Sequence, residues 1–373
     1  MKIAMIGQKG IPAKSGGVEK HVEELSKNLI SKGHDVTVYC RNTYVKDNQL
    51  EMYKGIKLKT IKTIENKSLD AIIYTLKATI HSLFIGKYDV YHYHALGPAS
   101  LSFIPKIFGK KVIVTVHGLD WQRDKWGKFA KLYLKLGEYI TGKFSNKIIS
   151  VSKNLQNYFI KKYERKGKDV VFIPNGVNII EPLEPNIIKK KYGLEKNGYI
   201  LFLARLVPEK GAHYLINAYK MLNINKKLVI AGGSSFTDDY VKELQELSNN
   251  NKDIIFTGSV EGNEVIELYS NCLVYVLPSD IEGMPLTLLE AMSLNKFSVV
   301  SNIEECLDVI KNEKYGISFE KSNVNSLYNA ITEALNLELN NNINPNYIKD
   351  YIKSHYNWNK VSNDTEGVYD SIL

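Results

Sequence analysis

The chain has 373 residues, of which 44% are hydrophobic and 24% charged, and its formal net charge is +9. This length exceeds one ordinary domain, so we expect two globular domains. The longest apolar stretch, residues 71–86, is interrupted by Lys77 and His81, which excludes a membrane-spanning helix there.

The first residues and the cysteines indicate where the protein works. MKIAMIGQKG (1–10) has an apolar part too short for a signal peptide, and it predicts a first strand instead. Cys40, Cys272 and Cys306 are scattered along the chain without a CxxC pair. Such cysteines are typical of reduced core thiols, so we expect a cytoplasmic protein.

Positive charge is concentrated in the first half of the chain. Residues 1–177 hold 31 Lys and Arg against 14 Asp and Glu, a net charge of +17, and the remaining residues hold 18 against 26, a net charge of −8. Much of the basic excess lies in residues 106–168. One domain is therefore expected to meet an anionic partner, and nucleic acid and an anionic membrane surface both fit, unless these lysines only form a solvated surface.

Short apolar segments alternate with amphipathic ones, and this rhythm predicts a mostly parallel, doubly wound α/β sheet. In the first half of the chain, strands are predicted at 2–7, 35–40, 88–94, 111–117, 147–152 and 169–174, and helices at 17–32 and 154–163.

The segment NIIEPLEPN (178–186) is the best candidate for a linker because it carries two prolines. After it the same rhythm starts again, with strands predicted at 198–206, 227–233, 253–258, 272–279, 297–302 and 316–320. The sequence thus predicts one Rossmann-like domain at 1–178 and a second at 186–350. A C-terminal helix at 351–373 is expected to return to the first domain.

Gly16 and Gly17 follow the first predicted strand and precede a helix. Glycines at this position let the backbone approach a phosphate at the helix N-terminus. Their spacing is not that of a GxGxxG dinucleotide motif, which argues against a dehydrogenase. The alternative is a plain turn between strand and helix.

Arg205 and Lys210 follow the apolar segment YILFLA (199–204) and come just before Gly211. Two cations at the carboxyl end of a strand can neutralise a leaving diphosphate, as a metal ion does in other enzymes. No DxD motif occurs in the chain, so we expect no divalent metal and no cofactor. The alternative is that both cations are solvated.

Three histidines lie on neighbouring predicted strands. His117 ends the apolar segment VIVTVH, so it is expected to face a cleft, although a satisfied structural histidine is the alternative. His92 and His94 alternate along one strand and share a face. An HxH pair can bind zinc, but no third ligand lies nearby in the sequence, so no metal site is predicted.

The fragment DIEGMPLTLLEAMS (280–293) carries two carboxylates eight residues apart. Pro285 suits the first position of a helix, so Glu282 is predicted in the preceding loop and Glu290 about one turn into the helix. A helix N-terminus after a strand suits a phosphate, and carboxylates on either side can hold hydroxyls. This arrangement matches a phosphorylated sugar, unless both glutamates are solvated.

Several motifs in this order resemble those of the family 4 retaining glycosyltransferases, which have the GT-B fold of two Rossmann-like domains facing a central cleft. They are GQKGIPAKSGGVE (7–19), VTVHGLD (114–120), SVS (150–152), IPNGVN (173–178), FLARLVPEKG (202–211), AGG (231–233) and EGMPLTLLEAM (282–292). The resemblance covers nearly the whole chain. GQKGIPA together with HGLDWQRDKWGKFAK is similar to the rhamnosyltransferase-like branch that builds bacterial surface polysaccharides.

The resemblance implies a role for each matching residue. His117, Arg205, Lys210 and Glu282 would be catalytic, with His117 beside the reacting sugar and both cations on the diphosphate. Glu290 would hold the ribose hydroxyls, with the base near Ser259. The remaining donor-binding positions would be Gly16, Gly17, Gly258, Val260, Gly283, Met284, Pro285 and Leu286. Glu19 and His94 would lie on the acceptor side.

Two positions depart from the family pattern. The family has a Gly and a Pro after the helix at 286, where this chain has Asn295 and Phe297. Asn tolerates the left-handed conformation that Gly would supply, so the turn is expected to survive, although the donor becomes less certain.

The expected function is transfer of a sugar from a nucleotide-sugar donor to a lipid-linked or oligosaccharide acceptor, with retention and without a metal. The protein would work in the cytoplasm, peripherally bound through its basic first half to the inner face of the cell membrane, and without nucleic acid. A GT-B sugar-nucleotide 2-epimerase and a non-catalytic sugar-nucleotide-binding protein remain the alternatives.

Overall fold

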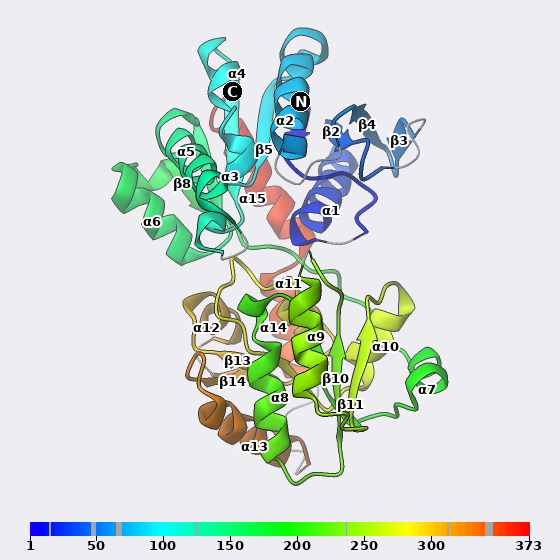
Figure 1. The fold of residues 1–373 in the computed structure, drawn as a ribbon. Coiled ribbons are helices and arrows are strands. Elements are labelled where there is room, and N and C mark those ends of the chain that lie inside the picture. The colour runs from blue at the N-terminus through cyan, green and yellow to red at the C-terminus, as the bar shows by residue number, and fades with distance from the viewer. Residues whose placement is uncertain are drawn as a thin grey trace. The chain divides into compact units, whose positions relative to one another are not determined.

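The chain forms two compact units. A computed structural model describes residues 1–14, 16–45, 50–64, 69–123, 126–235, 237–311, 313–339 and 346–373. Unit 1 consists of Met1–Gly176 together with Trp358–Leu373, and unit 2 consists of Val177–Asn357 (Figure 1). Each unit is built around its own sheet, and each is described by itself.

The unit 1 sheet has the strand order β3-β4-β2-β1-β5-β6-β7-β8, and its pairs are parallel apart from the antiparallel pair of β3 and β4. Its strands are β1 (Lys2–Ile6), β2 (Asp35–Arg41), β3 (Met52–Tyr53), β4 (Ile56–Ile61), β5 (Val90–His94), β6 (Lys111–Val116), β7 (Lys147–Ser150) and β8 (Val170–Phe172). The strand order reverses between β1 and β5, because β2 follows on one side and β6 on the other.

Helices surround this sheet. They are α1 (Gly17–Ser31), α2 (Leu69–His81) with the π-helical turn η1 (Ser82–Gly86), α3 (Leu96–Ala99), α4 (Phe103–Ile107), η2 (Asp120–Gln122), α5 (Lys128–Phe144), α6 (Lys153–Tyr163), η3 (Gly167–Asp169) and α15 (Trp358–Asp370). Strands β1, β5 and β6 are buried along nearly their whole length. Burial on both faces explains the continuous apolar runs of β1 and β6, whereas β5 (VYHYH) also buries His92 and His94.

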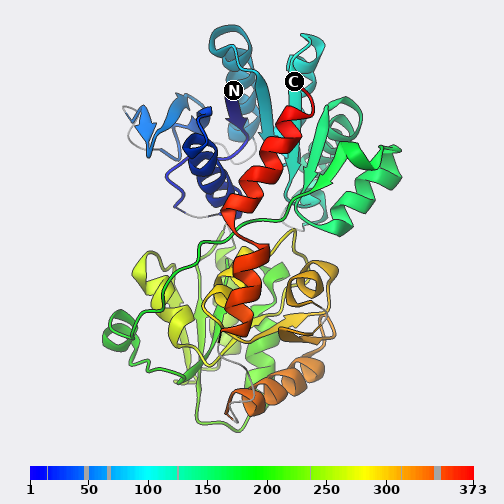
Figure 2. The ribbon, with the colours of Figure 1, turned by 180° about the vertical axis from the view of Figure 1, so that it is seen from behind.

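The last helix of the chain, α15, packs on α1 within unit 1 (Figure 2). Glu366 accepts hydrogen bonds from Lys32 and His34, at 2.8 Å and 2.7 Å. Tyr369 is fully buried and hydrogen-bonds His92 of β5 at 2.8 Å. The end of the chain therefore completes the core beside the first strands.

The unit 2 sheet is entirely parallel, with the order β11-β10-β9-β12-β13-β14. Its strands are β9 (Tyr199–Leu203), β10 (Lys227–Ala231), β11 (Ile254–Gly258), β12 (Val274–Leu277), β13 (Ser298–Ser301) and β14 (Gly316–Phe319). Its helices are α7 (Ile187–Tyr192), η4 (Pro208–Lys210), α8 (Ala212–Met221), α9 (Asp238–Leu247), α10 (Asn263–Asn271), α11 (Leu286–Ser293), α12 (Glu304–Ile310), α13 (Val324–Leu339) and α14 (Tyr347–His355). Here the order reverses between β9 and β12.

The predicted strands and the helices at 17–32 and 154–163 are confirmed, and the parallel α/β architecture of both halves with them. The single helix expected at 351–373 is wrong, because the chain leaves the helical path at Asn357, which forms a β-bridge with Val177. Its first part belongs to α14 of unit 2, and only α15 belongs to unit 1. Strands β3 and β4 were not predicted, because β3 has only two residues and IKLKTI of β4 alternates with lysine. Pro285 precedes α11 rather than starting it, since its ψ of 92° is extended. Among the described residues, no helix is long and apolar enough to cross a membrane.

A buried carboxylate ties the segment after β6 to two helices. Glu138 of α5 is 1% exposed and accepts hydrogen bonds from Trp121, Tyr158 and Tyr163, at 2.6 to 2.9 Å. Lys162 of α6 donates to the same carboxylate at 2.7 Å. Burial alone would raise the pKa of Glu138, but these four donors outweigh it and lower the pKa.

We predict that Glu138→Gln destabilises the protein by about 2 kcal/mol, because hydrogen bonds to a charged group contribute roughly 1.5–3 kcal/mol. A folded-state pKa below the unfolded value means that the stabilisation is complete above about pH 4.3 and is lost as the pH falls through the folded-state pKa. Urea denaturation at several pH values should therefore show a gap between parent and variant that narrows in acid. The exposed Glu51→Gln is the control, and an equal loss in both variants would contradict the prediction.

Candidate functional site

In unit 2 the candidate residues lie on the loops that follow β9 and β12. These neighbouring parallel strands both end at the same edge of the sheet, where the strand order reverses, and such a point is the usual ligand site of an open α/β sheet. Arg205 is half-buried in the loop after β9, and Lys210 ends the turn η4. Gly211 then takes φ +71°, and a Cβ there would lie 1.9 Å from the carbonyl oxygen of Pro278. Only glycine allows the two loops to approach this closely.

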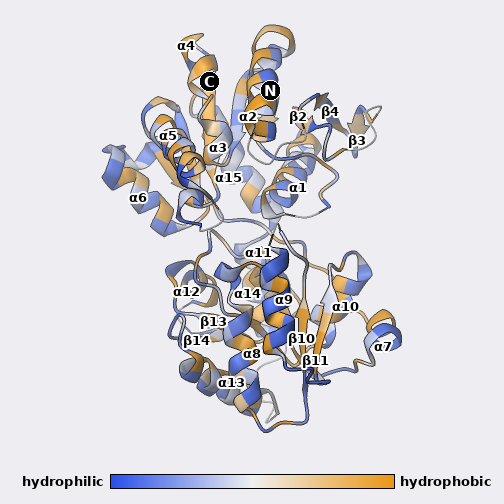
Figure 3. Ribbon diagram, viewed as in Figure 1, coloured by the Kyte–Doolittle hydropathy of each residue, from blue (hydrophilic) through white to orange (hydrophobic). Residues whose placement is uncertain are grey.

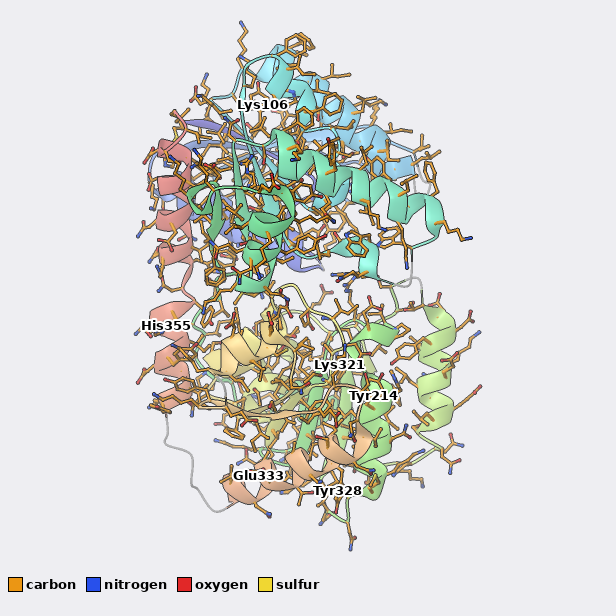
Figure 4. The ribbon with its side chains drawn as sticks, turned by 90° about the vertical axis from the view of Figure 1, so that its left-hand side faces the viewer. Lys106, Tyr214, Lys321, Tyr328, Glu333 and His355 are labelled. Carbon is orange, nitrogen blue, oxygen red and sulfur yellow. The ribbon has the colours of Figure 1, made fainter. Side chains whose placement is uncertain are left out.

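The two loops are held together by charge. Lys210 Nζ donates a hydrogen bond to the carboxylate of Glu282, and their side chains are 15% and 7% exposed. The backbone N–H of Asp280 donates to the carbonyl of Glu209 at 2.9 Å. Tyr214, labelled on α8 in Figure 4, donates to the carboxylate of Asp280 at 3.3 Å. The structure thus brings together two residues that are distant in the sequence and that were both predicted to bind the donor.

The second glutamate of the fragment lies on α11. Glu290 is half-buried and accepts a hydrogen bond from Tyr269 at 3.2 Å. Burial, followed by the nearby charge of Glu290, raises the pKa of Tyr269 well above its usual value, so this hydroxyl stays protonated and remains a donor. Gly283 and Pro285 are buried, whereas Met284 and Leu286 are partly exposed.

The segment predicted to meet the base follows β11, at the same edge of the sheet. Gly258 and Ser259 are exposed and Val260 is partly exposed. The Ser259 hydroxyl lies against Gly233, where a Cβ would be 2.2 Å from it. The segment after β11 therefore packs on the one after β10.

In unit 1 the candidate residues likewise follow strands next to the reversal of strand order. Gly16 precedes α1 with φ +101°, and Gly16 and Gly17 are both exposed. Glu19 is buried, and its carboxylate accepts the backbone N–H of Lys9 at 3.0 Å. A Cβ at Gly16 would lie 2.1 Å from that carboxylate. Glu19 thus shapes the loop around the two glycines, and its predicted place on the acceptor side stays untested.

Three histidines from different elements meet beside this loop. His94 ends β5 and is fully buried, and His117 follows β6 and is partly exposed. Nδ1 of His94 and Nε2 of His117 are 3.3 Å apart. His21 of α1 places its ring centroid 4.9 Å from that of His117, edge to face. Its Nδ1 hydrogen-bonds Oδ1 of Asn175 at 2.8 Å.

His92 shares the face of His94, as predicted, with ring centroids 4.2 Å apart. Both of its ring nitrogens are already used, by Tyr369 at 2.8 Å and by Thr115 at 2.7 Å. His92 is therefore a satisfied core histidine, and the other three form a separate group.

These imidazoles are held neutral. Burial lowers the pKa of His21 to about 4, although its bond to Asn175 acts the other way. Burial, together with the neighbouring histidines, lowers the pKa of His94 and His117 well below the usual value. Neutral rings offer lone pairs to hydroxyl donors or to a cation and cannot act as fixed positive charges.

The sequence analysis missed His21 and Asn175 as members of this site. His21 stands on the buried face of an ordinary amphipathic helix, so its spacing carries no signal of function. Asn175 lies within the motif IPNGVN that was singled out, but nothing in the sequence connects it with a histidine 154 residues away.

Two family models match most of the chain. Residues 15–180 match the model described as Glycosyltransferase Family 4, and residues 185–354 match the one described as Glycosyl transferases group 1. The resemblance to the family 4 glycosyltransferases, which the motifs indicated, is therefore confirmed.

Individual relatives agree with the family models. An uncharacterized glycosyltransferase of Methanocaldococcus jannaschii is 26% identical, covering 99% of this chain and 98% of that protein. The UDP-Gal:alpha-D-GlcNAc-diphosphoundecaprenol alpha-1,3-galactosyltransferase of Escherichia coli is 28% identical over 84% of each chain. The structure of Anabaena HepE in complex with UDP and glucose superposes with a TM-score of 0.79 at 18% identity, covering 100% of both chains. The predicted two-domain fold is therefore confirmed.

We predict that the free energy of unfolding falls as the pH drops from about 6.5 to about 4. In this range an unfolded histidine binds a proton that buried His21 does not, so stability rises with pH by up to about 1.4 kcal/mol per pH unit for each such group. His21→Gln should flatten this slope, as measured by urea denaturation. By NMR, the His21 ring should not titrate above about pH 5, whereas a midpoint near 6.5 would refute the prediction.

Proposed function

We propose that this chain, which belongs to the glycosyltransferases of the GT-B fold, transfers a sugar from a nucleotide-sugar donor to a lipid-linked saccharide in bacterial polysaccharide synthesis. The observation that carries the proposal is the pairing of Lys210 with Glu282, beside Arg205, where the strand order of unit 2 reverses. Cations and a carboxylate side by side suit a ligand that joins a diphosphate to a sugar.

The donor would bind in three parts. Arg205 and Lys210 would hold the diphosphate, since cations stabilise the charge that grows on a leaving phosphate. Glu290 would accept from the ribose hydroxyls, because a carboxylate can hold a diol with both oxygens. The base would lie near Gly258 and Val260, on the exposed segment after β11.

The ion pair of Lys210 with Glu282 has a consequence for binding. With Glu282 as its partner, the charge of Lys210 is already compensated. A diphosphate would draw Lys210 away, and the freed Glu282 carboxylate would accept from hydroxyls of the sugar. When Lys210 leaves Glu282 for the diphosphate, Glu282 becomes free for the sugar, so binding of the phosphate and binding of the sugar would be coupled.

The transfer would retain the configuration of the anomeric carbon and need no metal. The bond between the anomeric carbon and the phosphate oxygen would break while the acceptor hydroxyl oxygen bonds to the same carbon. The acceptor would approach on the face of the sugar from which the phosphate leaves. The acceptor proton would pass to the leaving phosphate. His117, neutral and partly exposed, would accept from the primary hydroxyl of the sugar, as the resemblance implies.

The acceptor side is proposed for unit 1. The E. coli relative is named for an acceptor that carries diphosphoundecaprenol, and such a lipid would have to be reached at a membrane. Helix α5 exposes Phe129 and Leu132, at 71% and 68%, next to lysines. Hydrophobic residues also gather on α4, which is largely orange in Figure 3. An apolar surface flanked by lysines suits the cytoplasmic face of an anionic membrane.

Two observations point to different donor sugars. GQKGIPA and HGLDWQRDKWGKFAK resemble the rhamnosyltransferase-like branch, whereas the E. coli relative is named for galactose transfer. Incubating the protein with a panel of nucleotide-sugars and a lipid-diphosphate saccharide, followed by mass spectrometry, decides the function. A glycosylated acceptor supports the proposal. A nucleotide-sugar epimer points to a 2-epimerase, and binding without turnover points to a non-catalytic protein.

We predict that Glu290→Ala weakens binding of the nucleoside diphosphate by roughly 1.5–3 kcal/mol, because a diol loses a charged acceptor. In calorimetry this is about a 10- to 100-fold higher Kd. Glu246→Ala, on the exposed face of α9, is the control and should bind like the parent. Unchanged affinity in Glu290→Ala would remove this residue from the site.

We predict that Arg205→Ala and Lys210→Ala each lower kcat by roughly 100- to 1000-fold, the range seen when one donor to a developing negative charge is removed. Activity of the parent should persist in EDTA, because these cations replace a metal. Lys220→Ala, an exposed lysine of α8, is the control. Loss of activity in EDTA that magnesium or manganese restores would contradict the metal-free mechanism.

We predict that the protein sediments with anionic vesicles and less so at high salt, because each lysine near an anionic surface contributes about 1 kcal/mol. Replacing Lys128, Lys131 and Lys143 of α5 with Glu should release it. Lys125, in the basic segment 106–168, lies outside the described residues. Lys135 is left in place because it lies over the Trp121 ring, 5.0 Å from its centroid.

The matched control carries the same change of charge in unit 2. Lys189, Lys190 and Lys196 are exposed, and their triple replacement with Glu should leave sedimentation unchanged. Equal release by both triple variants would show an effect of net charge only and would refute docking through α5.

A further inference from the structure

The three histidines of unit 1 form a set of possible metal ligands. His21, His94 and His117 each offer one ring nitrogen, and these nitrogens all lie within 4.8 Å of one another. They come from α1, from the end of β5 and from the residue after β6, so three separately anchored elements bring them to one point. No other group of three or more such ligands occurs in the part of the chain that the structure describes.

The spacing is close to what a zinc ion requires. Zinc binds imidazole nitrogen at about 2.0–2.1 Å in tetrahedral geometry, which places two ligand nitrogens about 3.3 Å apart. His94 Nδ1 and His117 Nε2 are already 3.3 Å apart. The widest pair, at no more than 4.8 Å, would have to close by at most about 1.5 Å, which rotation of the rings can supply.

The surroundings of the rings also suit a metal. Nδ1 of His21 hydrogen-bonds Asn175, which leaves Nε2 as the ligand atom. A metal-binding histidine almost always has its second nitrogen held by such an outer partner. Nε2 of His94 lies 3.4 Å from the Met5 sulfur, which leaves its Nδ1 towards His117. Burial keeps the imidazoles neutral, with lowered pKa values, and the neutral ring is the form that binds metal.

We propose that His21, His94 and His117 bind one Zn²⁺ ion through three imidazole nitrogens. The sequence predicted no metal because the HxH pair of His92 and His94 lacked a third ligand. In the structure His92 is not available as a ligand, because Tyr369 and Thr115 hydrogen-bond both of its ring nitrogens. His21 and His117 lie beside His94 and would be the other two ligands.

The bound zinc ion would inhibit the proposed sugar transfer rather than assist it. Zinc on His117 would take the lone pair proposed to hold the sugar hydroxyl, so catalysis without metal and inhibition by zinc are compatible. This consequence rests on the proposed function, whereas binding of zinc does not, and the two are measured separately.

The binding test uses the whole chain after treatment with a chelator and removal of the chelator. Titration with Zn²⁺ against a chromophoric chelator should show one tight site per chain. Co²⁺ should give the visible absorption of a four-coordinate complex. His21→Gln should weaken zinc binding at least tenfold, and Asn175→Ala by roughly 10- to 100-fold, the range for loss of an outer partner.

His355→Ala is the control, because this histidine lies at the surface of unit 2 on α14 (Figure 4). It should bind zinc like the parent. Equal affinity in the parent and His21→Gln would overturn the proposal, and so would the absence of a tight site in the parent. If thermal melting shows that His21→Gln does not fold, the zinc site is tested by the Co²⁺ spectrum of the parent and by the Asn175→Ala titration. A parent without the four-coordinate Co²⁺ absorption, or an Asn175→Ala variant that binds zinc like the parent, would overturn the proposal.

The activity test is separate. Stoichiometric Zn²⁺ should abolish sugar transfer by the parent, and EDTA should restore it. An active enzyme that keeps its full rate with the site loaded would refute the inhibition. If no nucleotide-sugar is turned over, the proposed function fails, and the binding titration still decides the zinc site.

Discussion

The parallel pairing of β9 with β12 is the constraint on which the candidate site of unit 2 depends. Parallel strands end at the same edge of a sheet, and the order of this sheet reverses between these two. Loops at such a reversal are the usual place for a ligand in an open α/β sheet. Here the loops after β9 and β12 carry Lys210 and Glu282. Because the two strands end side by side, Gly211 of one loop packs against the carbonyl of Pro278 in the other.

Unit 1 repeats the arrangement with different chemistry. Its strand order reverses between β1 and β5, and the segments after β1, β5 and β6 carry the glycine loop, His94 and His117. The unit 2 site contains ionised groups that compensate each other, whereas the unit 1 site contains neutral imidazoles. The large positive charge of the first half of the chain thus lies outside its candidate site, on helices such as α5.

Burial decides how these side chains can act. Glu282 is nearly buried and needs the charge of Lys210, because an uncompensated carboxylate would be costly there. His21 and His94 are buried and the partly exposed His117 packs beside them, so protonating any one of them is opposed by desolvation. The charges in the unit 2 site are thus compensated by one another, and the imidazoles of the unit 1 site are kept neutral.

Much of the fold was predictable, because each buried parallel strand is an apolar run long enough to be recognised, as in KVIVTV and CLVYVL. Strand β3 was missed because it has only two residues, and β4 because its exposed positions are Lys57 and Lys59, so neither is a continuous apolar run. The glycine loop, the cations after β9 and the two glutamates of DIEGMPLTLLEAMS could be selected because each stands next to a predicted strand or helix.

The sequence by itself determined the order of strands and helices, the family and the residue types at the ends of the strands. Only the tertiary structure decided which of them meet. Lys210 and Glu282 are 72 residues apart and His21 and Asn175 are 154 apart, so no local pattern connects them. Their contact follows from which strands pair, and that pairing is set by packing of the whole sheet, to which every helix contributes.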